Sequence, residues 1–172
     1  MFRLTIATED VHQFIHDPNH FATTWGWIKS DVLGGRLPVD YGTFNLFVVV
    51  GPESRQMRYR LYFSDRSGHP LTLAGFKDVH RNRVTALWPD TSTLYTRILN
   101  GHVEEGHEDP ADLVGCGILH ILPADFAVQM TTFRARGPDI CAGLEGLAAF
   151  GEFFGSQLWK VYRPRVSTPR CV

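Results

Sequence analysis

Six side chains that could bind a ligand or transfer a proton lie on or beside predicted strands. They are Arg60, Lys77, Trp88, Asp90, Tyr95 and His120. In a binding site, Lys77 would supply a cation, Asp90 an acceptor and Trp88 an apolar wall. In a cavity enzyme, Lys77, Asp90 or His120 would be the acid or base. The alternative is a solvated sheet exterior with cross-strand pairs, and for His120 a core histidine bonded to one partner.

The stretch Trp88-Pro89-Asp90-Thr91 is the most distinctive part of the sequence. Proline fixes its own φ and keeps the preceding residue extended. Asp90 can hydrogen bond to its own backbone and close a turn. A strand is expected directly afterwards, over residues 92–99. The functional surface is therefore expected to be formed by a β-sheet and its loops.

Complete catalytic and cofactor motifs are missing from the sequence. Gly115-Cys116-Gly117 lacks the third glycine of a dinucleotide fingerprint and does not sit at a strand-to-helix turn. Three histidines are spaced by four within residues 12–20, but Pro18 breaks the helix that would align them as metal ligands. The acidic segment 102–109 has neither zinc nor calcium spacing and is typical of a solvated loop. The sequence predicts no cofactor, no metal site and no catalytic residue.

Alternating apolar residues predict most of the strands. In residues 57–64, Met57, Tyr59, Leu61 and Phe63 share one face, while Arg58, Arg60 and Tyr62 share the other. Short strands are also expected over residues 2–7 and 92–99. The apolar runs 43–50 and 113–122 predict strands that are buried on both faces.

Gly75 leaves the orientation of the following residues open. If Gly75 forms a β-bulge, Phe76 turns inward and Lys77 turns outward. If the strand stays regular, Lys77 lies on the apolar face, where a buried ammonium group needs a partner or a ligand.

Helical periodicity is found near both ends of the chain. A short helix is expected after Thr8, which suits an N-cap, and two C-terminal helices are expected from Pro123 to about Arg136 and from Pro138 to about Tyr162. This order predicts an α+β fold with a mainly antiparallel sheet of about seven or eight strands, curled into a barrel or half-barrel. We expect one domain over residues 1–163 and a poorly ordered tail over 164–172.

The charge balance argues against a nucleic-acid partner. The chain has 17 lysines and arginines against 18 aspartates and glutamates, whereas polyanion binding requires a basic excess. Three cysteines without C-x-x-C spacing predict reduced thiols and a cytoplasmic protein. No segment reaches the roughly 18 apolar residues of a membrane-spanning helix.

Several stretches, in this order and at this spacing, resemble one protein family. They are Gly42–Phe47, Met57–Arg60, Gly75–Lys77, Leu87–Tyr95, Gly117–Leu119, Asp125-Phe126, Gln129-Met130 and Phe150–Phe154. The chain resembles, from about Leu33 to Tyr162, an accessory domain of long bacterial polypeptides of the glucose-methanol-choline oxidoreductase type. In these cholesterol-oxidase-like polypeptides the domain lies between a flavin module and an α/β-hydrolase-like module.

The resemblance implies which modules accompany this domain, and it implies no catalytic chemistry in this chain itself. The flavin-binding glycines and the hydrolase nucleophile belong to the neighbouring modules. No catalytic residue of the family therefore falls on this chain. What the resemblance implies is an apolar ligand such as a sterol or lipid, with a flavin oxidoreductase or a hydrolase as partner.

Three hypotheses for function follow. The first is a non-catalytic accessory domain that binds an apolar, lipid- or sterol-like molecule in the curled sheet. The second is a small enzyme with a barrel cavity, such as an isomerase, cyclase or hydratase. The third is a structural module for protein–protein interaction. The packing of the sheet interior and the oligomeric state distinguish them.

Overall fold

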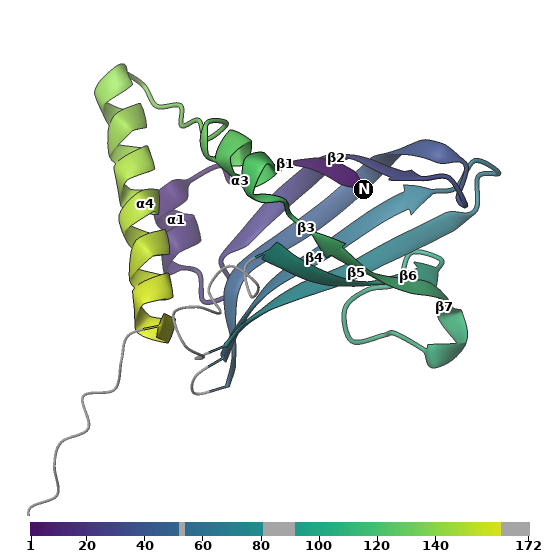
Figure 1. Cartoon of the computed structure of the whole chain (residues 1–172). Helices are drawn as coiled ribbons and strands as arrows, with labels where there is room; N and C mark the ends of the chain where they lie inside the picture. Colours follow the sequence, from purple (N-terminus) through teal and green to yellow (C-terminus); the bar gives the residue numbers. More distant parts are fainter. Residues whose placement is uncertain (52–53, 81–91, 163–172) are drawn as a thin grey trace, which may run out of the picture.

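Within the residues that the structure describes, 1–51, 54–80 and 92–162, seven antiparallel strands form one curled sheet in the computed structural model (Figure 1). The strands are β1 (Phe2–Ala7), β2 (Phe21–Ser30), β3 (Gly35–Gly51), β4 (Ser54–Ser64), β5 (Pro70–His80), β6 (Thr93–Asn100) and β7 (Leu113–His120). The helices are α1 (Val11–His16), α3 (Pro123–Met130) and α4 (Ile140–Tyr162), with a short 3-10 turn, η2, at Pro110–Asp112. Strands neighbour one another in chain order, so the α+β fold with a curled antiparallel sheet is confirmed.

The β4–β5 hairpin defines the two faces of the sheet. Its pairing is regular from Ser54 opposite His80 to Ser64 opposite Pro70. Because side chains alternate with a period of two, paired residues share a face. Leu61 is fully buried on the face that we call inner, and Arg60 marks the face that we call outer.

The inner face carries the hydrophobic core. Two clusters of buried residues cover it, one nearer the helices (Phe14, Ala22, Phe44, Leu46, Phe47, Met57, Tyr59, Val79, Leu94 and Phe153) and one nearer the far end (Ile28, Leu37, Val39, Leu61, Phe63, Leu71 and Leu73). Leu61, Phe63 and Val79 are 0% exposed and Leu94 is 1% exposed. A void that could hold water would expose the side chains that line it. The protein's own side chains therefore fill the space around these residues.

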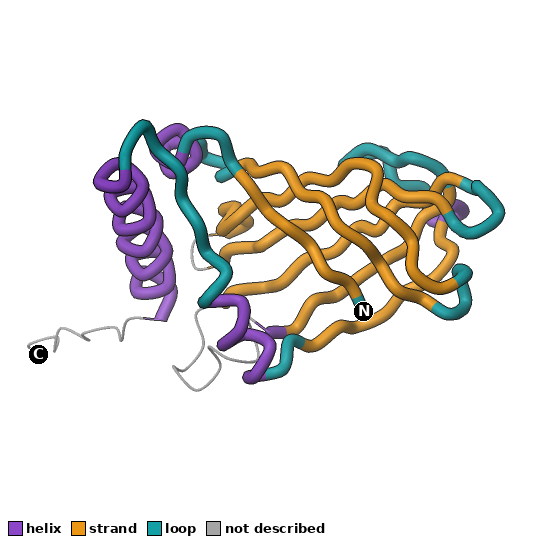
Figure 2. Tube along the Cα trace, turned by 90° about the horizontal axis from the view of Figure 1, so that it is seen from above, coloured by secondary structure: helices purple, strands orange, loops and turns teal. Residues whose placement is uncertain are grey.

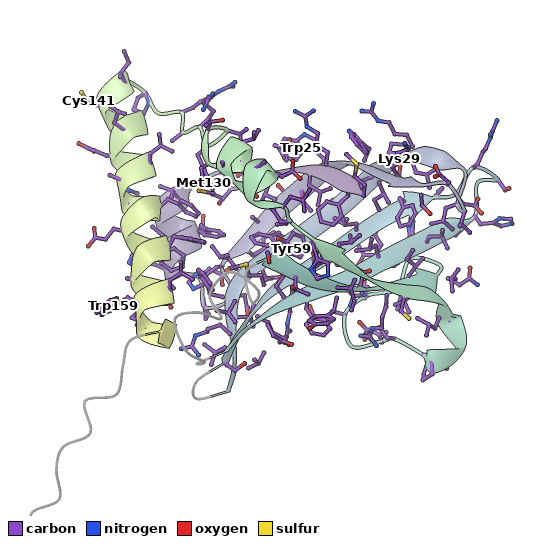
Figure 3. The ribbon with its side chains drawn as sticks, in the orientation of Figure 1. Trp25, Lys29, Tyr59, Met130, Cys141 and Trp159 are labelled. Atoms are coloured by element: carbon purple, nitrogen blue, oxygen red, sulfur yellow. The ribbon has the colours of Figure 1, made fainter. Side chains whose placement is uncertain are left out.

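Helix α4 stands across one end of the sheet beside α1 (Figure 1 and Figure 2). The ring of Phe153 meets His20 edge-on at 4.6 Å between centroids, and Phe154 meets Phe47 of β3 at 5.3 Å. These aromatic contacts join the helix to the inner core. Trp159 lies exposed on α4 (Figure 3). None of the helices in the described part of the chain has the length and hydropathy of a membrane span.

The N-cap of α1 is Asp10, so the expectation of Thr8 was wrong. The Asp10 carboxylate accepts hydrogen bonds from the backbone N–H groups of His12 at 2.7 Å and Gln13 at 3.0 Å. The hydrogen bonds from Gln13 and His12 lower the pKa of this carboxyl. A carboxylate is the stronger acceptor for the unpaired amides of a first helical turn.

Helix α3 is shorter than its sequence predicts. It ends at Met130 and does not continue to Arg136. The hydroxyls of Thr131 and Thr132 donate to the carbonyls of Val128 and Gln129, each at 2.7 Å. Threonine hydroxyls that bond to nearby carbonyls compete with the helical ladder.

Strand β7 is an edge strand, which corrects the expectation that it is buried on both faces. Val114 is 53% exposed and Ile118 is 55% exposed. β6 lies on one side of β7, and β7 ends the sheet on the other. An apolar run predicts a strand but does not reveal its place in the sheet.

The sheet stays regular at Gly75, which decides the alternative left open by the sequence. Tyr59 pairs with Gly75 and Met57 pairs with Lys77 without a register shift. Phe76 therefore faces outward, and Lys77 faces inward and is only 4% exposed. A Cβ at Gly75 would lie 3.3 Å from Leu94 Cδ1, so glycine at this position makes room for Leu94.

Candidate ligand-binding groove

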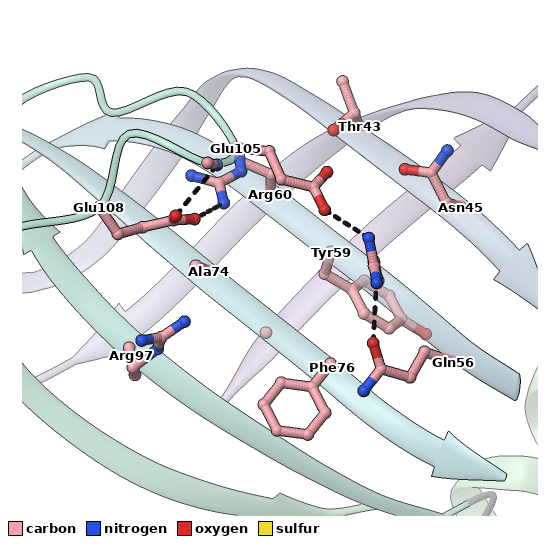
Figure 4. A pocket seen from close by; sticks show the side chains of 13 residues that line it. Thr43, Asn45, Gln56, Tyr59, Arg60, Ala74, Phe76, Arg97, Glu105 and Glu108 are labelled. Atoms are coloured by element: carbon pink, nitrogen blue, oxygen red, sulfur yellow. Dashed lines mark hydrogen bonds and ion pairs between the residues drawn. The ribbon is translucent and has the colours of Figure 1, made fainter. Parts of the chain in front are cut away.

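A groove of about 400 Å³ lies on the outer face of the sheet (Figure 4). Residues Ala74–Phe76 of β5 form its floor, and Glu105, Gly106 and Glu108 form one wall. Further lining comes from Thr43, Asn45, Gln56, Arg58, Tyr59, Arg60 and Arg97. Its size lies within the range of small-molecule sites.

The strand register explains the shape of the groove. Arg60, Ala74 and Arg97 are direct neighbours across β4, β5 and β6. A short alanine between two long arginines leaves a hollow on the sheet surface. In the adjacent row Phe76 pairs with Tyr95, and their rings stack at 5.5 Å. The floor thus combines two cations with an apolar shelf.

The β6–β7 loop, residues 101–109, is held against the outer face of the sheet. The Thr72 hydroxyl donates to the Gly101 carbonyl at 2.7 Å and accepts from the Val103 N–H at 2.9 Å. Arg60 Nη1 donates to the Val103 carbonyl at 2.6 Å. The loop therefore lies over β4 and β5, while most of its residues stay exposed, as its sequence predicts for a solvated loop.

Two ion pairs tie the loop to β4 with different strength. Arg60 pairs with Glu108, and the two side chains are only 11% and 19% exposed. Arg58 pairs with Glu105 at 2.5 Å, where the exposed fractions are 35% and 57%. Exposed pairs contribute little because water and salt screen them. The Arg60–Glu108 pair is thus the anchor of the loop, and the Arg58–Glu105 pair is easily exchanged.

The pKa of Glu108 reflects this anchor. Desolvation raises the pKa of the carboxyl, but the hydrogen bond and positive charge of Arg60, with the backbone N–H of Gly106, outweigh it and lower the pKa overall. Glu108 therefore stays ionised beside Arg60. The contact contributes stability above the ordinary pKa of a glutamate and loses it as the pH falls through the lowered value.

Arg97 is a cation of the groove that has no partner among the described residues. Within residues 1–51, 54–80 and 92–162, no hydrogen bond or ion pair involves its guanidinium. Its side chain is exposed and lies across Ala74 from Arg60 (Figure 4). A guanidinium presents paired donors that match a carboxylate or phosphate. An anion could therefore bind here without displacing a described protein partner.

The structure brings together only part of the predicted set of six. Arg60 lines the groove, and Tyr95 stacks on the groove residue Phe76. His120 is exposed on the edge strand β7, where its Nδ1 lies 3.3 Å from the Thr93 hydroxyl. Trp88 and Asp90 lie outside the described residues.

Lys77 occupies the opposite face from the groove. Its Nζ lies 5.8 Å from the centre of the Tyr59 ring, over the face of the ring. Burial lowers the pKa of Lys77 to about 8 and raises the pKa of Tyr59. A cation in this apolar layer belongs to the core and does not line the outer groove.

Sequence reasoning missed the acidic wall and the position of Arg97 across Ala74 from Arg60. Arg58 and Arg60 were visible as one face of β4, but Arg97 joins them only through the pairing of three strands. Glu105 and Glu108 were part of an acidic loop that predicted solvation. The available signal was charge complementarity between this loop and the arginines of β4.

Comparisons with protein-family models, with curated proteins and with solved structures found no match to this chain. The arguments about function therefore start from the groove itself. The resemblance to the accessory domain of oxidoreductase polypeptides stays a prediction.

Glu108→Gln is expected to loosen the loop. The substitution removes the charge that faces Arg60, and a hydrogen bond to a charged group contributes about 1.5–3 kcal/mol, so amide exchange at Val103 and Gly106 should speed up by about tenfold or more. Hydrogen exchange followed by NMR measures this. Glu104→Gln is the matched control, because no described hydrogen bond involves that side chain. Equal exchange in both variants would contradict the anchoring role.

Proposed function

We propose that this chain is a non-catalytic binding domain that holds a lipid-like molecule with an acidic head group in the outer groove. The observation that carries the proposal is the position of Arg97, without a described partner, beside the shelf formed by Phe76 and Tyr95. A charged head group beside an apolar body is the chemistry that this combination recognises.

The two parts of the ligand would bind by different forces. The acidic group would accept hydrogen bonds from Arg97 above the Ala74 floor, each contributing about 1.5–3 kcal/mol. The apolar body would lie on Phe76, where burial contributes about 25 cal/mol per Å². A second acidic group would compete with Glu105 for Arg58, because that ion pair is exposed.

The packed inner face favours the groove over the sheet interior. The first hypothesis from the sequence placed an apolar ligand inside the curl. Leu61, Phe63 and Leu94 are 0–1% exposed there, so the packed side chains leave no room for a ligand around them. The lipid- or sterol-like character of the ligand, and a flavin oxidoreductase or hydrolase as partner, remain proposals from the resemblance.

The cavity-enzyme alternative has less support. It places Lys77, Asp90 or His120 inside a cavity. Lys77 is packed in the core and His120 is exposed on the edge strand, while Asp90 lies outside the described residues. These positions do not favour a shared acid–base site.

Acidic amphiphiles are expected to stabilise the protein and their neutral analogues to do so much less. Dodecanoate is compared with 1-dodecanol, and a steroid carboxylate with its parent sterol, by thermal unfolding and isothermal titration. Ligand at about 100 times its Kd adds about 2.7 kcal/mol, which raises Tm by roughly 5–10 °C. Arg97→Gln should weaken binding by about 10- to 100-fold through the lost charged hydrogen bonds.

Arg3→Gln provides the control, because Arg3 is an exposed arginine on β1 that does not line the groove. It should leave the affinity unchanged. The proposal fails if no acidic probe binds, or if Arg97→Gln and Arg3→Gln bind the acidic probes equally well.

A further inference from the structure

The outer face of β2 and β3 leaves large aromatic rings in water. Phe21 and Trp25 of β2 are 43% and 49% exposed, and Tyr41 of β3 is 50% exposed. All three point away from the buried residues that alternate with them along the strands. A shift in the β2–β3 register places Trp25 opposite Asp40–Tyr41. Single exposed rings are ordinary, but several rings on one face mark an interaction surface.

Two cations lie side by side on the same face, nearer the β2–β3 turn. Lys29 pairs with Arg36 across the two strands, and both side chains are exposed. Like charges directly opposite one another destabilise a sheet. Among the residues that the structure places, no ion pair involves either cation, and neither Asp40 nor Asp31 in the turn neutralises them. An anionic partner would relieve this repulsion.

A cation–π contact joins the cations to the aromatic rings. The Cζ atom of Arg36 lies 4.4 Å from the centre of the Trp27 ring. Trp27 is two residues from both Trp25 and Lys29, so it shares their face of β2. A guanidinium stacked on a ring still presents N–H groups at its edge, where they can bind phosphate oxygens. Aromatic and cationic groups thus form one continuous surface.

An anionic bilayer surface fits this combination of side chains. Tryptophan and tyrosine concentrate at the head-group level of membranes, and lysine and arginine attract anionic lipids. The sheet curls around its inner face, so the outer face is convex, and Trp25 and Lys29 project from the same side of it (Figure 3). Such a surface suits a planar, fluid partner. Nucleic acid fits less well, because the chain has 17 basic against 18 acidic residues and so no basic excess.

We infer that the outer face of β2 and β3 docks this protein on an anionic bilayer surface. The rings of Phe21, Trp25 and Tyr41 lie among the lipid head groups, and Lys29 and Arg36 bind their anionic groups. The docking is peripheral, so it requires no membrane-spanning segment. None of these five residues lines the groove, so the inference does not depend on what the groove binds.

Vesicle binding tests the cations. The probes are sucrose-loaded vesicles of phosphatidylcholine with and without phosphatidylserine, followed by co-sedimentation. The native chain should bind the anionic vesicles about 10- to 30-fold more tightly, since each lysine or arginine near the surface contributes about fivefold, and added salt should weaken the binding. Lys29→Gln should lose about fivefold, and the double variant Lys29→Gln, Arg36→Gln should lose the preference. Lys160→Gln, at an exposed lysine of α4, is the matched control and should bind like the native chain.

Quenching of tryptophan fluorescence by nitroxide-labelled lipids tests the rings. Trp25→Ser should bind several-fold more weakly and lose much of the quenching, whereas Trp159→Ser should change neither, because Trp159 is equally accessible but lies on α4. Equal binding to the two kinds of vesicle, or equal effects of Lys29→Gln and Lys160→Gln, would overturn the inference. So would binding of an oligodeoxynucleotide through Lys29 without vesicle binding, which would assign the face to nucleic acid. Melting curves of every variant establish that it is folded.

Discussion

Lys77→Met is expected to raise the free energy of unfolding at pH 7 by about 1–4 kcal/mol, because the pKa of Lys77 falls from 10.5 to about 8 and each pKa unit corresponds to about 1.4 kcal/mol. Lys77 is 4% exposed on the inner face, and burial lowers the pKa of its amine to about 8. At pH 7 the folded protein therefore keeps an ammonium ion where an uncharged group would be more stable. Methionine has a similar length and fills irregular apolar space well.

The same substitution should change how stability depends on pH. Below pH 8 Lys77 is protonated in both the folded and unfolded states, so it adds no slope. Between pH 8 and the ordinary lysine pKa of 10.5 the unfolded chain binds the extra proton, so stability rises with pH, by about 2–3 kcal/mol up to pH 10. Above pH 10 the raised pKa of Tyr59 acts in the opposite direction, because unfolded tyrosine ionises first.

Urea unfolding from pH 7 to pH 10 measures both effects. The native chain should gain stability over the upper part of this range, and Lys77→Met should lose that gain. Lys29→Met is the matched control, because Lys29 is an exposed lysine on β2. If Lys77→Met and Lys29→Met show the same slope, the buried position of Lys77 has no energetic consequence and the argument is wrong.

Phe47→Ala is expected to lower the free energy of unfolding by about 3–5 kcal/mol, the usual cost of truncating a buried phenylalanine. Phe47 is 1% exposed, and its ring meets Phe154 of α4 at 5.3 Å. The β3–β4 pairing shifts register between Asn45 and Val48, and Phe47 has a φ of 54° within this irregularity. The left-handed backbone costs about 1–2 kcal/mol, which the buried ring must offset. Alanine keeps the strained backbone but loses the ring.

Thermal and urea unfolding test this expectation. For a chain of this size, the loss corresponds to a fall in Tm of roughly 10 °C. Val49→Ala, two residues away on the same strand, is the control, because Val49 is 62% exposed and its truncation should change stability by less than about 0.5 kcal/mol. Similar losses in the two variants would show that Phe47 does not join α4 to the sheet.

The two substitutions examine opposite properties of the same inner face. Lys77→Met removes a buried charge that lowers the free energy of unfolding. Phe47→Ala removes a buried aromatic ring that raises it. Both Lys77 and Phe47 lie near the helical end of the sheet, in or beside the cluster that contains Phe153. Together they measure how tightly the inner face is packed. This packing is the reason why the ligand is proposed to bind on the outer face.

The strands themselves were readable from local patterns. The alternation from Met57 to Phe63 predicted both β4 and the separation of its apolar face from Arg58 and Arg60, because the side-chain period of a strand is two. The change to helical spacing after Pro123 predicted two C-terminal helices in the same way. The α+β class follows from the order of these elements.

The groove depends on contacts that no local pattern contains. Arg60, Ala74 and Arg97 lie on three different strands. The acidic wall comes from a loop more than 40 residues further along the chain than Arg60. The exposure of β7 depends likewise on its place at the end of the sheet.

By itself the sequence determined the order and approximate position of the strands and helices and which side chains share a strand face, because those properties depend on residues close together in the chain. Only the tertiary structure decided that Lys77 is buried, that Glu108 meets Arg60 and that β7 is an open edge. Each of these depends on the register and order of paired strands, which are set by burial of the whole apolar face together.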